Sequence, residues 1–140
     1  MINNKNLLVT GGTGTFGKAF ISHILKNYKP KKVIVFSRDE MKQYEMGNHS
    51  DFKDHKNLRF FLGDVRDQER LSIAMDEVDY VIHAAALKQV PAAEYNPIEF
   101  IKTNIYGAEN VIKSSVEKNV KNVIALSTDK AVHPANLYGA

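Results

Sequence analysis

The chain has 140 residues, 44% of them hydrophobic and 25% charged, with a formal net charge of +3. This composition fits one globular domain and shows no repeat or low-complexity tract. The sequence has no cysteine, which excludes disulfides and thiolate metal sites, so we predict no metal site and a reducing, cytoplasmic location.

Basic residues are scattered along the chain, with small groups at Lys29, Lys31–Lys32, Lys53 and Lys56. They could form a nucleic-acid patch or a solvated surface. No basic stripe with interleaved aromatic residues occurs, so we favour the solvated surface and expect no nucleic-acid partner. No apolar run is long enough to cross a bilayer and the N-terminus lacks a signal-peptide core, so no membrane insertion is expected.

A glycine-rich loop follows the first predicted strand, Leu7–Thr10. Gly11, Gly14 and Gly17 have the spacing G-x-x-G-x-x-G, and Gly12 with the last two gives G-x-G-x-x-G. Glycines allow a sharp turn, close approach of a pyrophosphate and tight helix packing, while the helix N-terminus offers free N–H groups. A bare strand-to-helix turn would need the same glycines, but the position after a strand at the start of the chain favours a dinucleotide loop.

An amphipathic helix is predicted over Lys18–Tyr28, ended by Pro30, and a buried strand over Lys32–Phe36. Ser37 and Arg38 follow that strand at the place where dinucleotide folds read the ribose. A hydroxyl and a guanidinium suit a 2′-phosphate, which favours NADP over NAD. Alternatively, Arg38 pairs locally with Asp39 or Glu40.

The next segments predict a short helix over Glu40–Gly47, a polar loop over Asn48–Asn57 and a strand over Leu58–Leu62. Asp64 follows this strand. Its carboxylate could accept a hydrogen bond from the adenine amino group, or it could cap the helix that begins near Asp67. Both roles remain open.

A fourth strand is predicted over Asp79–His83, and the small residues Ala84–Ala86 follow it where a cofactor would lie against the backbone. We interpret His83 as a hydrogen-bonded core residue. The segment Pro91–Asn119 is predicted to be largely helical, with Asn104 either holding a water or a neighbouring backbone group or serving only helix packing. Its apolar face would be formed by Phe100, Ile101, Ile105, Ala108, Val111 and Ile112.

A fifth strand is predicted over Asn122–Leu126, followed by Ser127–Lys130 at its C-terminal end, where ligands bind in open parallel sheets. Asp129 and Lys130 could act there or form an exposed ion pair. Strands that alternate with helices predict an α/β, doubly wound parallel sheet of the NAD(P)-binding Rossmann type, incomplete after the fifth strand. Analogy with that fold predicts strand order 3-2-1-4-5, with Val123–Leu126 on an open edge.

Several stretches together resemble one family. Thr10–Gly17 resembles the loop of the extended short-chain dehydrogenases, and Ser37–Glu40, Phe61–Asp67, His83–Pro91 and Ser127–Lys130 narrow the match to the inverting UDP-N-acetylglucosamine 4,6-dehydratases. The resemblance covers essentially all 140 residues. It implies a UDP-sugar substrate, surface polysaccharide or glycan synthesis and, for the full-length form, a homo-oligomer.

The resemblance also implies roles for individual residues. The reaction would begin with hydride transfer from sugar carbon 4 to NADP, with Tyr138 assisting removal of the 4-hydroxyl proton. Lys130 would be the base at carbon 5, and a protonated Asp129 the acid at the leaving 6-hydroxyl; retaining relatives carry Asp-Glu at this place. Lys88 and Thr128 would contact substrate. The implied cofactor residues are Gly11, Gly14, Thr15, Phe16, Gly17, Ser37, Arg38, Asp64, Val65, Ala84, Ala85, Ala86 and Asn104.

One departure from the family pattern concerns the Tyr-x-x-x-Lys motif, whose lysine would lie four residues after Tyr138, beyond Ala140. The family's later strands and sugar-binding domain would also lie outside residues 1–140, which we therefore interpret as an incomplete NADP-binding domain that is inactive alone. A nucleotide-sugar epimerase and a non-catalytic NADP-binding module are the alternative functions.

Overall fold

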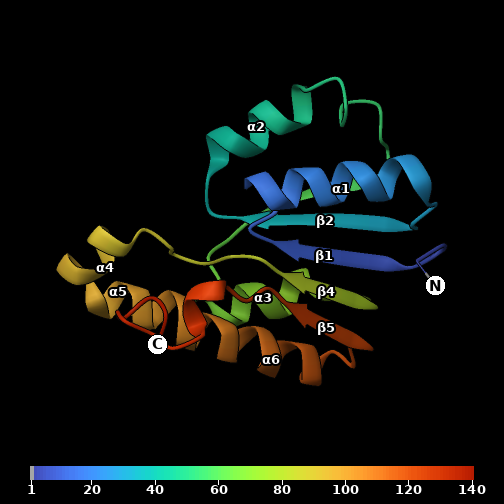
Figure 1. Cartoon of the computed structure of the whole chain (residues 1–140). Coiled ribbons are helices and arrows are strands. Elements are labelled where there is room, and N and C mark those ends of the chain that lie inside the picture. Colours follow the sequence, from blue (N-terminus) through green and yellow to red (C-terminus); the bar gives the residue numbers. More distant parts are fainter. Residues whose placement is uncertain (1) are drawn as a thin grey trace.

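Five parallel strands form the central layer of the computed structural model, which describes residues 2–140 (Figure 1). The strands lie in the order β3-β2-β1-β4-β5. The predicted sheet and its strand order are therefore confirmed, and every strand end lies within one residue of its predicted position. The strands are β1 (Asn6–Thr10), β2 (Lys32–Ser37), β3 (Leu58–Leu62), β4 (Tyr80–His83) and β5 (Asn122–Ala125).

Helices cover both faces of this sheet, as expected for a doubly wound fold (Figure 1). The helices α1 (Thr15–Asn27) and α2 (Glu40–Asn48) lie on one face, and α3 (Gln68–Ala74) and α6 (Gly107–Glu117) lie on the other. Helix α1 starts at Thr15 rather than at the predicted Lys18, because Gly14 is already its N-cap.

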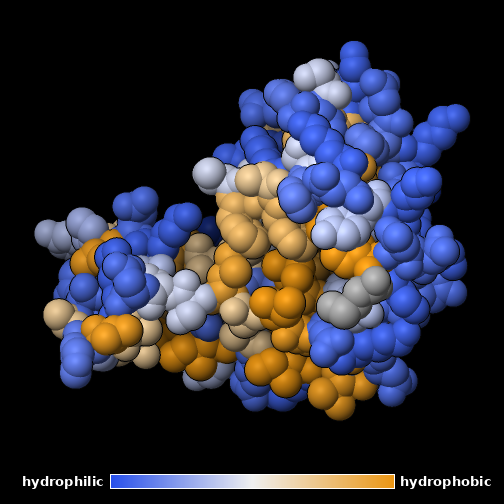
Figure 2. All heavy atoms as spheres, turned by 45° about the vertical axis from the view of Figure 1, so that its right-hand side comes forward, coloured by the Kyte–Doolittle hydropathy of each residue, from blue (hydrophilic) through white to orange (hydrophobic). Residues whose placement is uncertain are grey.

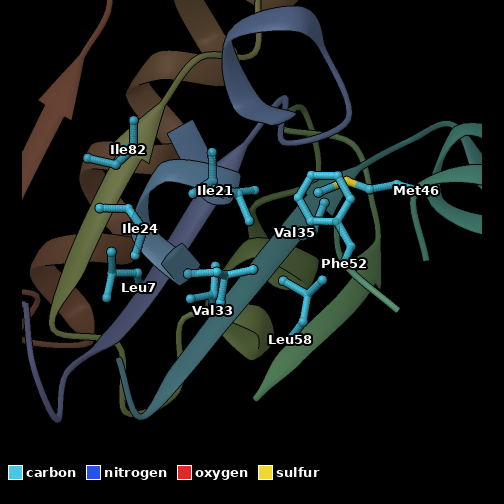
Figure 3. Packing of buried hydrophobic residues seen from close by; sticks show 11 residues of the cluster. Leu7, Ile21, Ile24, Val33, Val35, Met46, Phe52, Leu58 and Ile82 are labelled. Carbon is cyan, nitrogen blue, oxygen red and sulfur yellow. The ribbon is translucent and has the colours of Figure 1, made fainter. Parts of the chain in front are cut away.

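Two hydrophobic clusters divide the core by strand alternation. Successive strand residues point to opposite faces, so Leu7 and Val9 pack beneath α1 while Leu8 packs toward α3 and α6. Figure 3 shows the first cluster, in which side chains from α1 lie over those of β1 and β2. This cluster corrects one expectation: the segment Asn48–Asn57 is not only a polar loop, because Phe52 is buried against the core.

The predicted helix over Pro91–Asn119 is divided. The structure has α4 (Val90–Tyr95), α5 (Pro97–Ile101), a π-helix at Lys102–Tyr106, and then α6. Asn96 lies outside the helical region, at φ −132° and ψ 53°, because a following proline disfavours helical backbone.

The π-helix changes the predicted apolar face of this segment. Its wider turn shifts the direction of the following side chains relative to a continuous α-helix. Phe100 and Val111 are buried as expected, but Ile105 and Ile112 are exposed, so the predicted face was wrong for these two residues.

The strand β5 lies at one edge of the sheet, as predicted. Within residues 2–140 it pairs only with β4, and all of its residues are exposed. Apolar side chains gather on the face shown in Figure 2, and Val123, Ile124 and Leu126 are among the exposed large hydrophobic residues of the chain. None of the helices formed by residues 2–140 has the length and apolar character needed to cross a membrane.

Candidate functional site

The glycine loop joins β1 to α1 and leaves no room for side chains. Gly11 has φ +65°, and a Cβ atom there would lie 2.9 Å from the backbone of Ala84 and Ala85. A Cβ atom on Gly17 would lie 2.6 Å from Gly11 O, so only glycine lets α1 pack this closely on the loop. Gly14 N donates a hydrogen bond to Gly11 O at 2.9 Å and closes the turn. The first N–H groups of α1 thus face the C-terminal edge of the sheet.

A pocket of about 440 Å³ opens in front of this loop. It brings together most of the predicted cofactor residues, which come from the ends of β1, β2, β3 and β4. Phe16 and Asn104 do not line this pocket, and Gly17 is buried behind the loop. The predicted residues that line it are Gly11, Gly14, Thr15, Ser37, Arg38, Asp64, Val65, Ala84, Ala85, Ala86 and Lys88.

The pocket also contains residues that the sequence reasoning missed. Thr13, Lys42 and Leu87 line it, as does Thr103, whose hydroxyl is buried without a hydrogen-bond partner among residues 2–140. Lys42 could have been found from helical spacing, because it lies one turn after the helix cap Asp39, which also lines the pocket. Nothing in the local sequence marks Thr103, since the π-helix turns it toward the pocket.

A buried amide holds the end of the pocket formed by Ser37 and Arg38, called here the ribose end because the sequence predicts the cofactor ribose there. Gln43 is 9% exposed, and its Nε2 donates to Ser37 Oγ at 3.0 Å. The Ser37 hydroxyl hydrogen is therefore free to donate to a ligand acceptor. Arg38, with 54% of its side chain exposed, lies beside it. A hydroxyl donor and a guanidinium thus line the same pocket, a combination that suits a phosphate group.

The structure contradicts one of the two expected roles of Arg38, local pairing, and one of the two expected roles of Asp64, helix capping. Arg38 does not pair with Asp39 or Glu40; its Nη1 lies 3.7 Å from Asp64 Oδ2. Asp39 instead caps α2 by accepting a hydrogen bond from Lys42 N. Asp64 does not cap α3, because Asp67 does so by accepting from Arg70 N at 2.9 Å. The cap must precede the first helical residue directly, and only Asp67 does.

Asp64 is held by Arg66. The Arg66 side chain donates to Asp64 Oδ2 from Nη2 at 2.8 Å and from Nε at 3.1 Å, and the Arg66 amide donates to Oδ1 at 3.0 Å. Partial burial acts to raise the pKa of Asp64, but these hydrogen bonds outweigh it and hold that pKa below its ordinary value. Asp64 is therefore an anion in the wall of the pocket.

His83 is the core residue that the sequence predicted. Its Nδ1 lies 2.7 Å from Thr10 Oγ1, which also accepts hydrogen bonds from the amides of Ala84 and Ala85. Both lone pairs of that hydroxyl are in use, so its hydrogen is donated to Nδ1. Burial lowers the pKa of His83, and the ring is neutral with its proton on Nε2.

Asn104 lies in the π-helix and holds the segment that follows β4. Its Oδ1 accepts from Leu87 N at 2.9 Å and its Nδ2 donates to Leu87 O at 2.8 Å. The alternative in which the amide holds a neighbouring backbone group is thus confirmed. These two hydrogen bonds hold the Ala84–Leu87 segment, of which Ala84, Ala85 and Ala86 line both cavities of the site. π-Helices are frequent at functional sites.

A second cleft, of about 350 Å³, shares Ala84, Ala85, Ala86 and Lys88 with the first pocket. It brings together residues predicted for cofactor, substrate and catalysis from widely separated parts of the chain. These are Phe16, Asn104, Lys88, Thr128 and Tyr138, with His83 and Leu126 beside them.

Asp129 and Lys130 lie outside both cavities, in a short 3₁₀ turn after β5. Their side chains are 91% and 51% exposed, and Lys130 Nζ lies 3.7 Å from Asp129 Oδ1. The hydrogen bond from the Thr128 hydroxyl and the charge of Lys130 lower the pKa of Asp129. A protonated Asp129 would need an apolar or anionic setting, which residues 2–140 do not provide. In this part of the protein, Asp129 and Lys130 form an exposed ion pair.

The fold and the pocket define a protein of the Rossmann class, with a glycine loop, a helix N-terminus and a polar pocket arranged along one edge of a parallel sheet. The model of the polysaccharide biosynthesis protein family matches residues 7–140, and the chain belongs to that family.

Similar proteins agree with this assignment. The chain is 61% identical over 140 residues to a UDP-N-acetylglucosamine 4,6-dehydratase (inverting) of Campylobacter jejuni, covering 100% of this chain and 41% of that protein. It is 49% identical over 145 residues to a UDP-glucose 4-epimerase of Rickettsia typhi, covering 99% and 41%. The solved structure of Pen from Bacillus thuringiensis matches with a TM-score of 0.94 and 45% identity, covering 99% of this chain and 42% of that one. The chain thus spans about 41% of the length of the curated relatives it matches.

Proposed function

We propose that the chain belongs to an inverting nucleotide-sugar 4,6-dehydratase that acts on UDP-N-acetylglucosamine. The observation that carries this proposal is the 61% identity to the Campylobacter jejuni dehydratase over the whole chain. The pair Asp129–Lys130 supports it, since the family resemblance assigns that pair to the inverting branch. The product would be a 4-keto-6-deoxy sugar for surface polysaccharide or glycan synthesis.

We propose NADP as the cofactor in preference to NAD. The glycine loop suits a dinucleotide, since Gly11 and Gly14 line the pocket and carry no side chain that would fill it. Ser37, Arg38 and Lys42 line the ribose end and suit a 2′-phosphate. When bound, the dinucleotide supplies the transient oxidation of sugar carbon 4.

The cofactor proposal is tested by Arg38→Ala. Charge-assisted contacts are worth roughly 1.5–3 kcal/mol, so NADP affinity should fall by about one to two decades while NAD affinity changes little. Titration calorimetry with both cofactors measures this difference. Equal affinity of the unmodified protein for the two cofactors would contradict the proposal.

We assign the proposed substrate and proton-transfer roles mainly to residues that line the second cleft. Tyr138 lies there with Thr128 and Lys88, so we propose that Tyr138 moves the proton of the 4-hydroxyl while the other two contact the substrate. Lys130 is the proposed base at carbon 5. An acid role for Asp129 requires a carboxyl protected from water, which residues 2–140 do not provide. We therefore expect no dehydratase activity from these 140 residues alone.

The activity is tested on the full-length polypeptide as its gene encodes it. Incubation with UDP-N-acetylglucosamine should yield a product that has lost one water, as measured by mass spectrometry, with deuterium from solvent at carbon 5. Lys130→Ala should abolish that exchange and leave NADP binding intact. Asp129→Asn should slow the loss of water without abolishing the exchange. Normal exchange in the Lys130 variant would show that another residue is the base.

An epimerase is the second candidate, favoured by the 49% identity to the Rickettsia typhi UDP-glucose 4-epimerase. An epimerase product keeps its 6-hydroxyl, so the same mass measurement separates the two activities. Cofactor binding without turnover in the full-length polypeptide would instead support a non-catalytic NADP-binding module. We also propose a cytoplasmic location, supported by the cysteine-free sequence. The homo-oligomer and the absence of a nucleic-acid partner stay predictions.

A further inference from the structure

Five charged side chains of alternating sign run from the ribose end of the pocket to the start of the π-helix. They are Arg38, Asp64, Arg66, Glu99 and Lys102. Arg66 Nη1 donates to Glu99 Oε2 at 2.7 Å, and Lys102 Nζ donates to Glu99 Oε1 at 3.1 Å. Arg66 thus lies at the centre of the series, with one carboxylate on each side.

The Asp64 carboxylate has two cationic neighbours, but only one binds it closely. Arg66 gives it three hydrogen bonds of 2.8 to 3.1 Å. The Arg38 guanidinium lies 3.7 Å away, beyond hydrogen-bond length. Without Arg66, Arg38 would be the nearest remaining partner for this partly buried anion.

A 2′-phosphate and the Asp64 carboxylate would compete for the same guanidinium. Arg38 is one of the two cations that line the ribose end, and Asp64 lines the same pocket. We infer that Arg66 is a positioning residue for cofactor selectivity: by binding Asp64 closely, it keeps Arg38 beyond hydrogen-bond distance of that carboxylate, so that Arg38 can turn to the 2′-phosphate, and it offsets the charge that would repel that phosphate. The inference rests on the proposed use of NADP.

Arg66 acts through Asp64 rather than on the cofactor. It does not line the pocket, and its second amino group is held by Glu99 on α5. Lysine could not replace it, because one ammonium group cannot reach Glu99 and also reproduce the forked contact with Asp64.

The readout is the ratio of the NAD to the NADP dissociation constant, measured by calorimetry on the full-length polypeptide. Losses common to both cofactors cancel in this ratio, including any adenine contact of Asp64. Arg66→Gln should lower the ratio about two- to fivefold, the upper part of the range for a partly exposed ion pair. Arg66→Lys should lie close to Arg66→Gln. Lys118→Gln is the matched control, since it removes the same charge from an ion pair with Asp76, outside the pocket, and should leave the ratio unchanged.

Asp64→Asn completes a double-mutant cycle. It removes the competing carboxylate, so the ratio should rise, and adding Arg66→Gln should then change nothing further. This variant tests the inference even if Arg66→Gln fails to fold. Two results would overturn the inference about Arg66 and leave the proposed NADP use standing. In the first, the wild type prefers NADP and Arg66→Gln keeps the same ratio. In the second, the ratio of Asp64→Asn is unchanged or lower. Equal wild-type affinities would overturn the proposed NADP use and the inference with it.

Discussion

The strands β4 and β5 are adjacent and similar in sequence, yet they differ in burial. Val81 of β4 lies in register with Val123 of β5; Val81 is 0% exposed and Val123 is 39% exposed. β4 is flanked by β1 and β5, whereas β5 has one neighbour within residues 2–140. The proposed cofactor pocket lies at the ends of β1 to β4, whereas the proposed catalytic pair Asp129–Lys130 follows β5. Residues 2–140 thus form most of the proposed cofactor pocket, whereas the side chains of the proposed acid and base, Asp129 and Lys130, are exposed to solvent.

The strongest test of the buried region is Gly17→Ala. The added Cβ would lie 2.6 Å from Gly11 O and Gly12 Cα, so α1 must move away from the loop. We expect a loss of about 3 kcal/mol in the free energy of unfolding and loss of dinucleotide binding. Urea denaturation and calorimetry measure the two effects.

Gly47→Ala is the control for that substitution. Gly47 lies within α2, and an added Cβ would meet Phe60 at an ordinary contact distance of 3.4 Å. Alanine should therefore stabilise the protein by about 0.5–1 kcal/mol through helix propensity. Equal effects of the two substitutions would contradict the close packing of the glycine loop.

The matched valines test the comparison directly. Val81→Ala leaves a cavity in a packed core and should cost about 2 kcal/mol, whereas Val123→Ala should cost less than about 0.5 kcal/mol at a site open to water. Urea denaturation of both variants gives the difference. If Val123→Ala costs as much as Val81→Ala, β5 is covered in the protein by something outside residues 2–140.

The neutral His83 predicts a pH dependence. Because its pKa is lowered in the folded state, the unfolded chain binds a proton at higher pH than the native chain. Stability should be complete above about pH 6.5, the ordinary histidine value, and should fall as the pH falls through the lower folded-state pKa. Urea midpoints at a series of pH values measure this loss.

Two histidine variants show whether His83 causes the loss of stability at low pH. His83→Gln should remove the part of the slope that lies below about pH 6.5, whatever its effect on stability at neutral pH. His133→Gln changes an exposed side chain after β5 and serves as the control. A slope that survives in the His83 variant would show that another group titrates.

The smallest expected effect on stability is that of Ile124→Lys, within about 0.5 kcal/mol, because this side chain is 57% exposed. We predict that the 140-residue chain alone associates through the open β5 edge, and a charge there should reduce the association. Sedimentation at increasing concentration measures both forms. A stable monomer for the unmodified chain would contradict the role of the edge.

Local patterns in the sequence were sufficient to predict the fold. Apolar runs predicted all five strands, and Leu58–Leu62 has its predicted ends. Glycine spacing located the loop, because the positive φ of Gly11 and the contact of Gly17 with Gly11 and Gly12 restrict both positions to glycine within the loop itself. The strand ends then predicted which side chains would share a pocket, since parallel strands finish at the same edge.

Only the tertiary structure decided which partners those side chains meet. Asp64 binds Arg66 rather than a helix end, Arg38 faces Asp64 rather than Asp39, and Phe52 enters the core from a polar segment. The apolar sequence of β5 is that of a buried strand, and its exposure follows from its place at the edge of the sheet, which analogy with the fold predicted and the strand itself does not encode. Residue type and spacing determine local backbone conformation, whereas ion pairing, burial and protonation depend on groups that are distant in the chain and close only after folding.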